Sequence, residues 1–205
     1  MMGKKIVCLF MILVVVAFGL CASIATRPSV SAWFGAVFCH PTADYLQKYP
    51  GEPETDIPPF RTSRSFGFDV DVLNIAFIFD EENDSSVQVG AGLTYLNVSQ
   101  SLQYGLSVLK PYHGVGFLTD VNWRVNKRLE LGLRYRFLTC RFTGSETRFL
   151  VQEFELVPAF RFASVSAVDF FVSMPVTASW KADSISIRAS VALTFSLDSQ
   201  KVVGK

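Results

Sequence analysis

Histidine and cysteine are scarce in this chain of 205 residues, which has two histidines and four cysteines. None of them stands in a metal-ligand spacing or a CxxC pair, and no glycine-rich phosphate loop is present. We therefore expect no metal and no cofactor. The formal net charge of +1 provides no basic excess for binding DNA or RNA, so no nucleic-acid partner is expected. His40 with Thr42 and Asp44 could in principle serve acyl transfer, but a solvated histidine at a strand end, like His113, is the simpler interpretation, and we do not expect an enzyme.

Long apolar runs are absent except at the start, MMGKKIVCLFMILVVVAFGLCASIA. Two lysines, an apolar run and the small residues Ser23 and Ala25 predict a secretory signal peptide over residues 1–25. Cleavage before Trp33, lipid modification of Cys21 and an uncleaved anchor stay open as alternatives. A protein with several membrane-spanning helices is excluded, because no other segment approaches eighteen apolar residues. Cys39 and Cys140 remain beyond the predicted signal, either paired or as free thiols.

Aromatic residues are plentiful: 14% of the chain, with 19 phenylalanines. Many stand in segments of strict alternation, such as LELGLRYRF at Leu129–Phe137, where apolar side chains alternate with small or charged ones. Such alternation is typical of a strand with two unlike faces. The same pattern predicts eight strands, with a bulge or strand end near Asn74: Trp33–His40, Phe66–Val72, Val87–Tyr95, Gly114–Val125, Leu129–Phe137, Glu153–Phe162, Val168–Trp180 and Ser184–Leu197.

The connections between these strands tend to alternate between longer and shorter, as in outer-membrane barrels. Apolar faces of up to seven positions match the length of a membrane-spanning strand. Aromatic residues at strand ends are typical of interfacial girdles: Trp123, Phe137, Phe162, Trp180 and Phe195. We predict an all-β fold, an eight-stranded antiparallel up-and-down transmembrane β-barrel over residues 26–205, with a long first extracellular loop at about 41–62 and a short C-terminal tail. A soluble β-sandwich is the alternative.

Charged residues on the other strand faces can be paired by matching faces across hairpins. If Val125 faces Leu129, then Arg124 faces Glu130 and Asp120 faces Arg134. A register over the next loop pairs Arg136 with Glu153 and Arg134 with Glu155, and a five-residue turn after Phe162 sets Arg161 opposite Asp169. In a narrow barrel these charges must be paired. The predicted lumen ion-pair network therefore comprises Asp120, Arg124, Glu130, Arg134, Arg136, Glu153, Glu155, Arg161 and Asp169.

Three further charges fall on the inner faces, namely Asp69, Asp71 and Arg188. Inner-face glycines such as Gly90, Gly92 and Gly132 are interpreted as room for bulky neighbours such as arginine. The lumen is therefore expected to be filled by side chains, and a wide aqueous pore is not expected.

Two stretches, VNWRVNKRLELGLRYRF and KPYHGVGF, resemble OmpA-like and OmpW-like outer-membrane barrels, in which a tight turn precedes a strand ending in Y-R-F and P-Y-x-G-x-G opens a strand. The resemblance covers about 30 residues. It implies a small barrel in the outer membrane and marks the barrel type, not an activity. The chain departs from the family in ending with a polar tail, DSQKVVGK, and in having no peptidoglycan-binding domain after the barrel.

These observations predict a monomeric outer-membrane protein of a diderm bacterium with a structural and surface-interaction role. Its expected partners are outer-membrane lipid, the barrel-assembly machinery and a host or ligand contacted by the loops. The first loop, with five prolines and four acids, is expected to be extended and mobile. The alternative is an OmpW-like conduit for small hydrophobic molecules, which Phe171, Leu118 and Leu138 could line. A lipid-modifying enzyme ranks third.

Overall fold

The computed structural model describes residues 23–41, 61–72, 74–79, 85–101, 111–144, 146, 148–181 and 184–197. Residues 1–22 of the predicted signal peptide, most of the predicted first loop and the C-terminal tail lie outside these ranges. No helix within them is long and apolar enough to cross a membrane.

Eleven strands make up the described part of the chain, joined in one sheet. In three places two consecutive strands are separated only by a short break, namely β1 from β2, β3 from β4 and β9 from β10. Counting each such pair as one crossing of the barrel, the eleven strands form eight spans. Their bounds are β1 Ser23–Thr26, β2 Ser29–Pro41, β3 Arg61–Asp71, β4 Ile75–Phe79, β5 Ser86–Ser101, β6 Tyr112–Arg124, β7 Leu129–Phe142, β8 Arg148–Val165, β9 Val168–Ser173, β10 Val176–Lys181 and β11 Ser184–Leu197.

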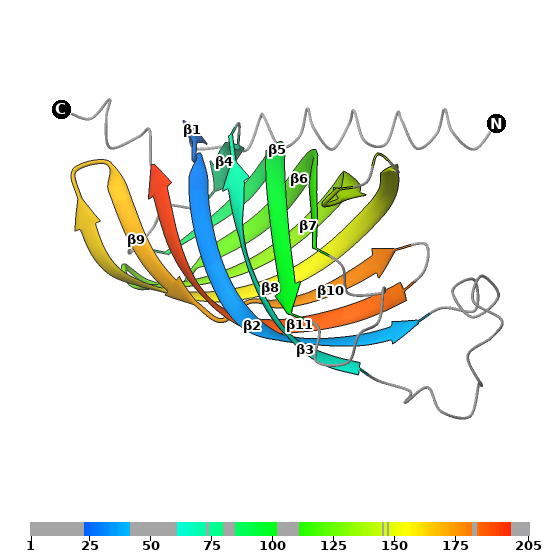
Figure 1. The fold of residues 1–205 in the computed structure, drawn as a ribbon. Helices are drawn as coiled ribbons and strands as arrows, with labels where there is room; N and C mark the ends of the chain where they lie inside the picture. Colours follow the sequence, from blue (N-terminus) through cyan, green and yellow to red (C-terminus); the bar gives the residue numbers. More distant parts are fainter. Residues whose placement is uncertain are drawn as a thin grey trace, which may run out of the picture.

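Every span pairs with its neighbours in sequence, and β11 pairs with β2 from Ser184↔Pro41 to Ser196↔Ser29, which closes the sheet. All of these pairings are antiparallel, including that of β5 with β6. Figure 1 shows the strands wrapping around a shared interior. The fold is therefore the predicted eight-stranded antiparallel up-and-down β-barrel, and a two-sheet sandwich is excluded because the sheet has no open edge.

The two ends of the barrel differ in their connections. The turns after β6 and β8 lie at one end, which we call the turn end, where Ser23 of β1 and Leu197 of β11 also lie. The other end is called the loop end, because β2 stops there at Pro41 and β3 begins there at Arg61. In Figure 1 the β8–β9 turn lies at the left, and β10 ends at the opposite side, where β11 begins.

The predicted irregularity near Asn74 is a break between β3 and β4. Asp71 pairs with Thr94 and Ile75 with Ala91, so the broken span has one residue more than the β5 segment that it faces, which is a bulge. Two other breaks contain a proline, Pro28 between β1 and β2 and Pro175 between β9 and β10. Proline has no N–H to donate to the ladder and therefore interrupts it.

The turn after β8 is shorter than predicted. β8 continues to Val165, and only Ser166, at φ 57°, and Ala167 separate it from β9. A bulge between Arg161 and Ala163 shifts the register, so Arg161 faces Phe171 and not Asp169. The five-residue turn was wrong because alternation cannot show whether an extra residue lies in a turn or is absorbed within a strand.

The turn after β6 has the predicted length. Val125 N–H donates to Leu129 O at 2.9 Å. Asn126 Oδ1 accepts from the backbone N–H groups of Arg128 at 2.8 Å and Leu129 at 3.0 Å, the side-chain mimic of a turn that asparagine favours.

Several strands extend beyond their predicted ends. β7 runs five residues past Phe137, and the first span begins at Ser23, ten residues before Trp33. Ser23, Ile24 and Ala25, assigned above to the signal peptide, pair with Ile78, Phe77 and Ala76. Outward polar residues, Thr139 and Arg141, hid the extension of β7, because they interrupt the apolar face without changing the alternation of the backbone. The extension of the first span was hidden because its first residues were assigned to the signal peptide and Pro28 interrupts the strand.

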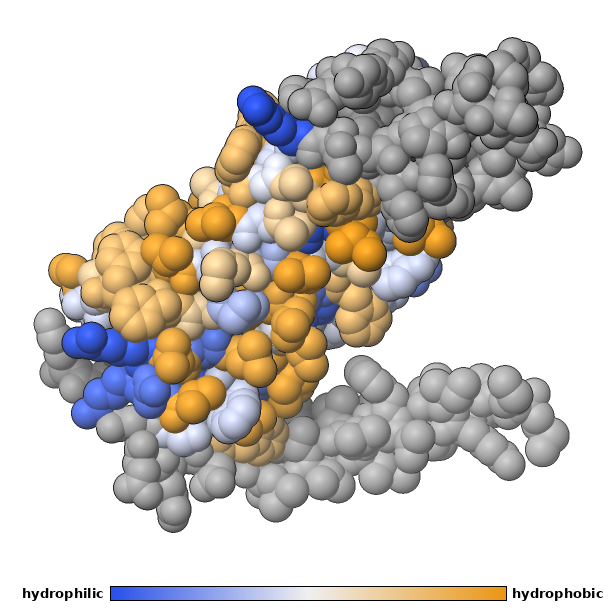
Figure 2. Space-filling view, turned by 90° about the horizontal axis from the view of Figure 1, so that it is seen from below, coloured by the Kyte–Doolittle hydropathy of each residue, from blue (hydrophilic) through white to orange (hydrophobic). Residues whose placement is uncertain are grey.

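The barrel has an apolar outside and a largely polar inside. Exposed large hydrophobic side chains cover its outer face, from Phe34 and Phe117 to Leu133 and Phe154, and Figure 2 shows apolar residues spread over the face of the barrel that it presents. Aspartate, glutamate, arginine, serine and threonine side chains are buried on the inner face. This polarity is the reverse of that of a water-soluble protein and belongs to a transmembrane barrel whose outer solvent is hydrocarbon. The charges of LELGLRYRF accordingly point inward and its leucines outward.

Candidate functional site in the barrel interior

An arginine on β7 lies at the centre of the interior charges. The guanidinium of Arg136, which is 1% exposed, lies 3.2 Å from Asp69, 3.5 Å from Glu153 and 3.4 Å from Glu155. Asp69 comes from β3, on the far side of the lumen, and the two glutamates come from β8. Arg136 therefore joins walls of the barrel that are not neighbours in the sheet.

The cross-strand register supports this cluster. β7 and β8 pair Arg134 with Glu155 and Arg136 with Glu153, the same pairs that face matching selects from the sequence. Arg134 lies 3.8 Å from Glu155, and Arg188 on β11 also lies 3.8 Å from Glu155. Glu155 is thus surrounded by three arginines.

Hydroxyl groups supply further hydrogen bonds to the buried carboxylates. Thr177 Oγ1 donates to Glu155 Oε1 at 2.9 Å, and Ser179 Oγ donates to Glu153 Oε1 at 2.9 Å. Arg188 in turn donates to Thr177 Oγ1 at 3.1 Å. Buried charges are tolerated where such bonds accompany the ion pairs, so we call this set the central ion cluster: Asp69, Arg134, Arg136, Glu153, Glu155 and Arg188.

A second ion group lies at the turn end. Arg124 Nε donates to Glu130 Oε1 at 3.1 Å, and Arg27 lies 3.7 Å from the same oxygen. Arg27 also donates to Gln88. Arg27 was not predicted as a lumen residue, because it stands in the break before β2, ahead of the first predicted strand. Its parity with Trp33 gave no signal, because the sequence left open which face of Trp33–His40 points outward.

Two predicted pairs differ in detail. Asp120 and Arg134 are opposite each other in the register, but Asp120 accepts a hydrogen bond from Asn74 Nδ2 at 2.9 Å, while Arg134 turns to Glu155. Arg161 and Asp169 are not opposite, yet their side chains lie 3.4 Å apart, and Arg161 also donates to the carbonyl of Lys127. Long side chains reach diagonal neighbours, so register alone does not decide the partner.

At Gly90 and Gly132 the missing side chain makes room for short polar groups and not for arginine, the example given above. A Cβ on Gly90 would overlap Asp120 and Asn74, and one on Gly132 would approach Asn122. Gly67 lies under the ring of Trp33. Their missing side chains make space for short polar groups and one indole.

The loop-end half of the interior is apolar and packed. A buried cluster consists of Trp33, Leu96, Val98, Tyr112, Leu138, Cys140, Val151 and Ala192, with Phe142 and Phe149 against it. Two cationic side chains pack against its aromatic rings. The guanidinium carbon of Arg188 lies 3.9 Å from the centroid of the Trp33 ring, and Lys181 Nζ lies 4.1 Å from the centroid of the Tyr112 ring. Cys140 is free and buried, whereas the side chain of Cys39 lies outside the description. We call this set the apolar plug.

The turn-end half contains a polar cavity of about 50 Å³. Its lining includes Arg27, Asn74, Asp120, Glu130 and Arg134, together with the ring of Phe171. Oδ1 of Asp120, Oδ1 of Asn74 and Nε of Arg134 have no hydrogen-bond partner among the described residues. A cavity of this size with several polar partners suits a few water molecules, not a drug-sized ligand.

The five aromatic residues predicted for the membrane interface all lie on the outer face and are 38–54% exposed. Trp123 and Trp180 lie one residue before the ends of β6 and β10, and Phe195 two before that of β11. Phe137 and Phe162 were wrongly placed at strand ends, because β7 and β8 continue to Phe142 and Val165.

Of the two histidines considered above for catalysis, only His113 has a described side chain. His113 Nε2 accepts a hydrogen bond from Arg141 Nε at 2.6 Å, and the side chains of His40, Thr42 and Asp44 lie outside the description. No group of three or more potential metal-ligating side chains gathers within the described part of the chain.

Comparison with known proteins gives only distant likenesses. No family model matches the chain, and no curated protein matches it. Among solved structures, the crystal structure of Ail, the attachment invasion locus protein of Yersinia pestis, is 13% identical over 84% of this chain and 99% of that one, with a TM-score of 0.40. The same protein in complex with the heparin analogue sucrose octasulfate is 13% identical over the same shares, with a TM-score of 0.34.

Proposed function

We propose that this chain is an outer-membrane protein of a diderm bacterium with a closed lumen, and that it acts through surface contact made by its loop end. The observation that carries the proposal is the polarity of the barrel: lipid-compatible side chains outside, and ion pairs that lock the walls together inside. A barrel with a filled lumen serves as a rigid scaffold. The connections at the loop end are then the surface through which it can contact other molecules.

The predicted signal peptide supports export, and delivery by the barrel-assembly machinery is part of the proposal, as are a monomeric state and a non-enzymatic role. The first connection at the loop end, residues 42–60, contains four of the five prolines noted above and all four acids. A segment of this composition has little apolar surface of its own to bury and suits contact with a host or another external ligand.

Deleting Glu52–Pro59 tests the surface-contact role. Cells that display the variant are expected to lose most of their adhesion to a cultured animal-cell monolayer, because the acidic, proline-rich contact segment is gone. A control chain in which the same eight residues are replaced by glycine and serine separates loss of the side chains from a shortened loop. Adhesion that equals that of the unaltered protein, or never exceeds that of cells without it, would refute the proposal.

The second candidate function is a conduit for small hydrophobic molecules, and the apolar plug at the loop end of the lumen favours it. A conduit also needs a side opening, but the registers of β5 with β6 and of β6 with β7 run unbroken from Ser86↔Arg124 to Tyr112↔Phe142. Leu118 and Leu138 are fully buried in the packed interior.

Conductance and uptake distinguish a closed barrel from a conduit or pore. Reconstituted protein is expected to show no stable large conductance in a planar bilayer, because the central ion cluster and the apolar plug fill the lumen. Cells that express it are expected to take up a hydrophobic dye no faster than cells that lack it. Steps of porin size would refute the closed lumen, and faster uptake would favour the conduit.

A further inference from the structure

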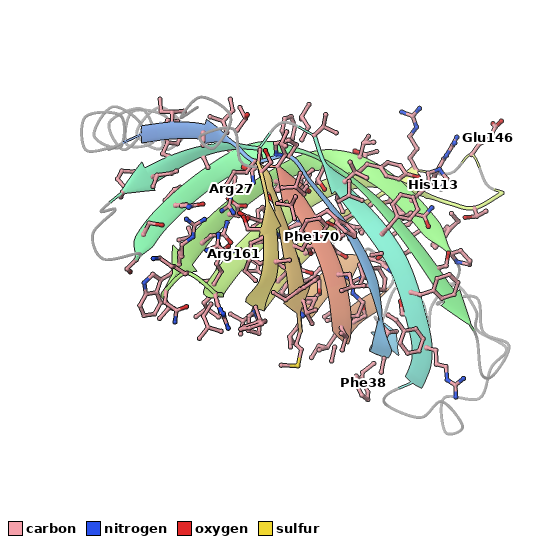
Figure 3. The ribbon with its side chains drawn as sticks, turned by 90° about the vertical axis from the view of Figure 1, so that its left-hand side faces the viewer. Arg27, Phe38, His113, Glu146, Arg161 and Phe170 are labelled. Carbon is pink, nitrogen blue, oxygen red and sulfur yellow. The ribbon has the colours of Figure 1, made fainter. Side chains whose placement is uncertain are left out.

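A row of basic residues crosses the outer face of the barrel at the loop end. His113, Arg141 and Arg148 are opposite one another on β6, β7 and β8. All three occupy outward positions, and both arginines are exposed. His113 and Glu146 lie at the end of the barrel opposite Arg161 in Figure 3, so this row belongs to the loop-end rim.

The two arginines lack a counter-charge within the described residues. Arg141 donates its Nε–H to Nε2 of His113. A histidine ring carries no negative charge, so this bond does not neutralise the guanidinium. Glu146, in the connection between β7 and β8, forms no ion pair within the described part of the chain. Like charges directly opposite each other destabilise a sheet, so two facing guanidinium groups call for an anion.

An apolar groove begins next to His113 and Arg141, on the turn-end side of the row. Its volume is about 520 Å³, and its outward walls include Leu93, Val115, Phe117, Phe137 and Thr139. Toward the turn end, Val115 is the next outward residue to His113 on β6, and Thr139 is the next outward residue to Arg141 on β7. Leu93 and Phe117 are also opposite each other in the register, as are Phe117 and Phe137.

We propose that this face binds one lipid of the outer leaflet that carries a phosphate group, with the phosphate held between Arg141 and Arg148 and an acyl chain in the groove. The occupant follows from the order of the two parts along the strands, a cationic rim above an apolar groove, which matches the order of headgroup and chain in a membrane lipid. Guanidinium groups bind phosphate through paired, charge-assisted hydrogen bonds. A soluble anion has no apolar chain that could occupy the groove.

Binding of a bisphosphorylated, multiply acylated disaccharide lipid to the detergent-solubilised full-length protein, measured by native mass spectrometry, tests this site. The double variant Arg141→Gln/Arg148→Gln is expected to raise the apparent Kd about tenfold or more for each lost guanidinium. Val115→Trp, which fills the groove without changing charge, is expected to weaken binding as well. Arg128→Gln removes an exposed arginine at the opposite end and is expected to leave the Kd unchanged.

Two further arms use the unaltered protein, so they decide the matter even if a variant fails to fold. The same lipid with its phosphates removed is expected to bind as weakly as the double variant, and millimolar inorganic phosphate is expected not to displace the intact lipid. Equal binding of the two lipids would overturn the proposal, as would complete displacement by inorganic phosphate, which would indicate a free-anion site. The loop-contact function stands or falls separately, because residues 42–60 take no part here.

Discussion

Replacing Arg136 with glutamine is expected to destabilise the folded barrel by about 3–5 kcal/mol, the cost of breaking a buried ion pair from one side. Arg136 is the shared partner of Asp69, Glu153 and Glu155, all three of them buried. Without it, Asp69 loses its ion-pair partner in the described residues. Of the contacts described there, Glu153 keeps the hydroxyl of Ser179, and Glu155 keeps the hydroxyl of Thr177 and the guanidinium groups of Arg134 and Arg188. Urea unfolding in lipid vesicles, followed by tryptophan fluorescence, measures the loss.

Arg128→Gln is the matched control for this experiment, because it removes the same charge from an exposed turn position. Its effect is expected to stay within about 0.5 kcal/mol, as for other surface substitutions. A second measurement is gel migration of unheated samples, in which the folded fraction of Arg136→Gln is expected to fall. If both variants unfold at the same urea concentration, the central ion cluster does not hold the barrel walls together.

Placing an arginine at Leu133 is expected to cost about 2–4 kcal/mol, the range for a cation on the lipid face of a barrel near the bilayer centre. Leu133 points outward, is 53% exposed and is the central residue of the outward apolar run from Leu129 to Phe137 on β7. On the exposed face of a soluble sheet the same substitution would be close to neutral. The free energy of unfolding in vesicles therefore reports directly which solvent surrounds the strand.

Thr143→Arg provides the comparison, since Thr143 is an exposed residue just beyond the loop end of β7. Arginine near the membrane surface costs little, so this variant is expected to unfold like the unaltered protein. An equally small effect at Leu133 would show that the outer face of the barrel does not meet hydrocarbon. The transmembrane interpretation and the outer-membrane location would then both fail.

The two effects have different origins, although both follow from inverted polarity. Arg136→Gln acts by leaving negative charges uncompensated in a space that water does not reach, whereas Leu133→Arg acts by exposing a new charge to lipid. A barrel that showed the first effect without the second would be a closed barrel in water. The pair of experiments therefore separates the closure of the lumen from the membrane location.

The sequence by itself determined the two faces of seven of the eight predicted strands, because alternation with a period of two does not depend on the rest of the fold. On the first predicted strand, Trp33–His40, which face points outward stayed undecided. It also allowed the register across the short β6–β7 hairpin to be predicted, because parity leaves few registers once a three-residue turn is assumed. Arg124 faces Glu130 in the structure, as that assumption predicts, but the register did not decide the side-chain partners of Asp120 and Arg134.

Only the tertiary structure decided which charges meet across the lumen. The contact of Arg136 with Asp69 joins β7 to β3, and the contact of Arg27 with Glu130 joins the first span to β7. Such contacts depend on how far each strand is shifted along its neighbour, summed around the whole closed sheet. A single bulge, such as the one between Arg161 and Ala163, changes that sum, and the local alternation of polar and apolar residues does not reveal it.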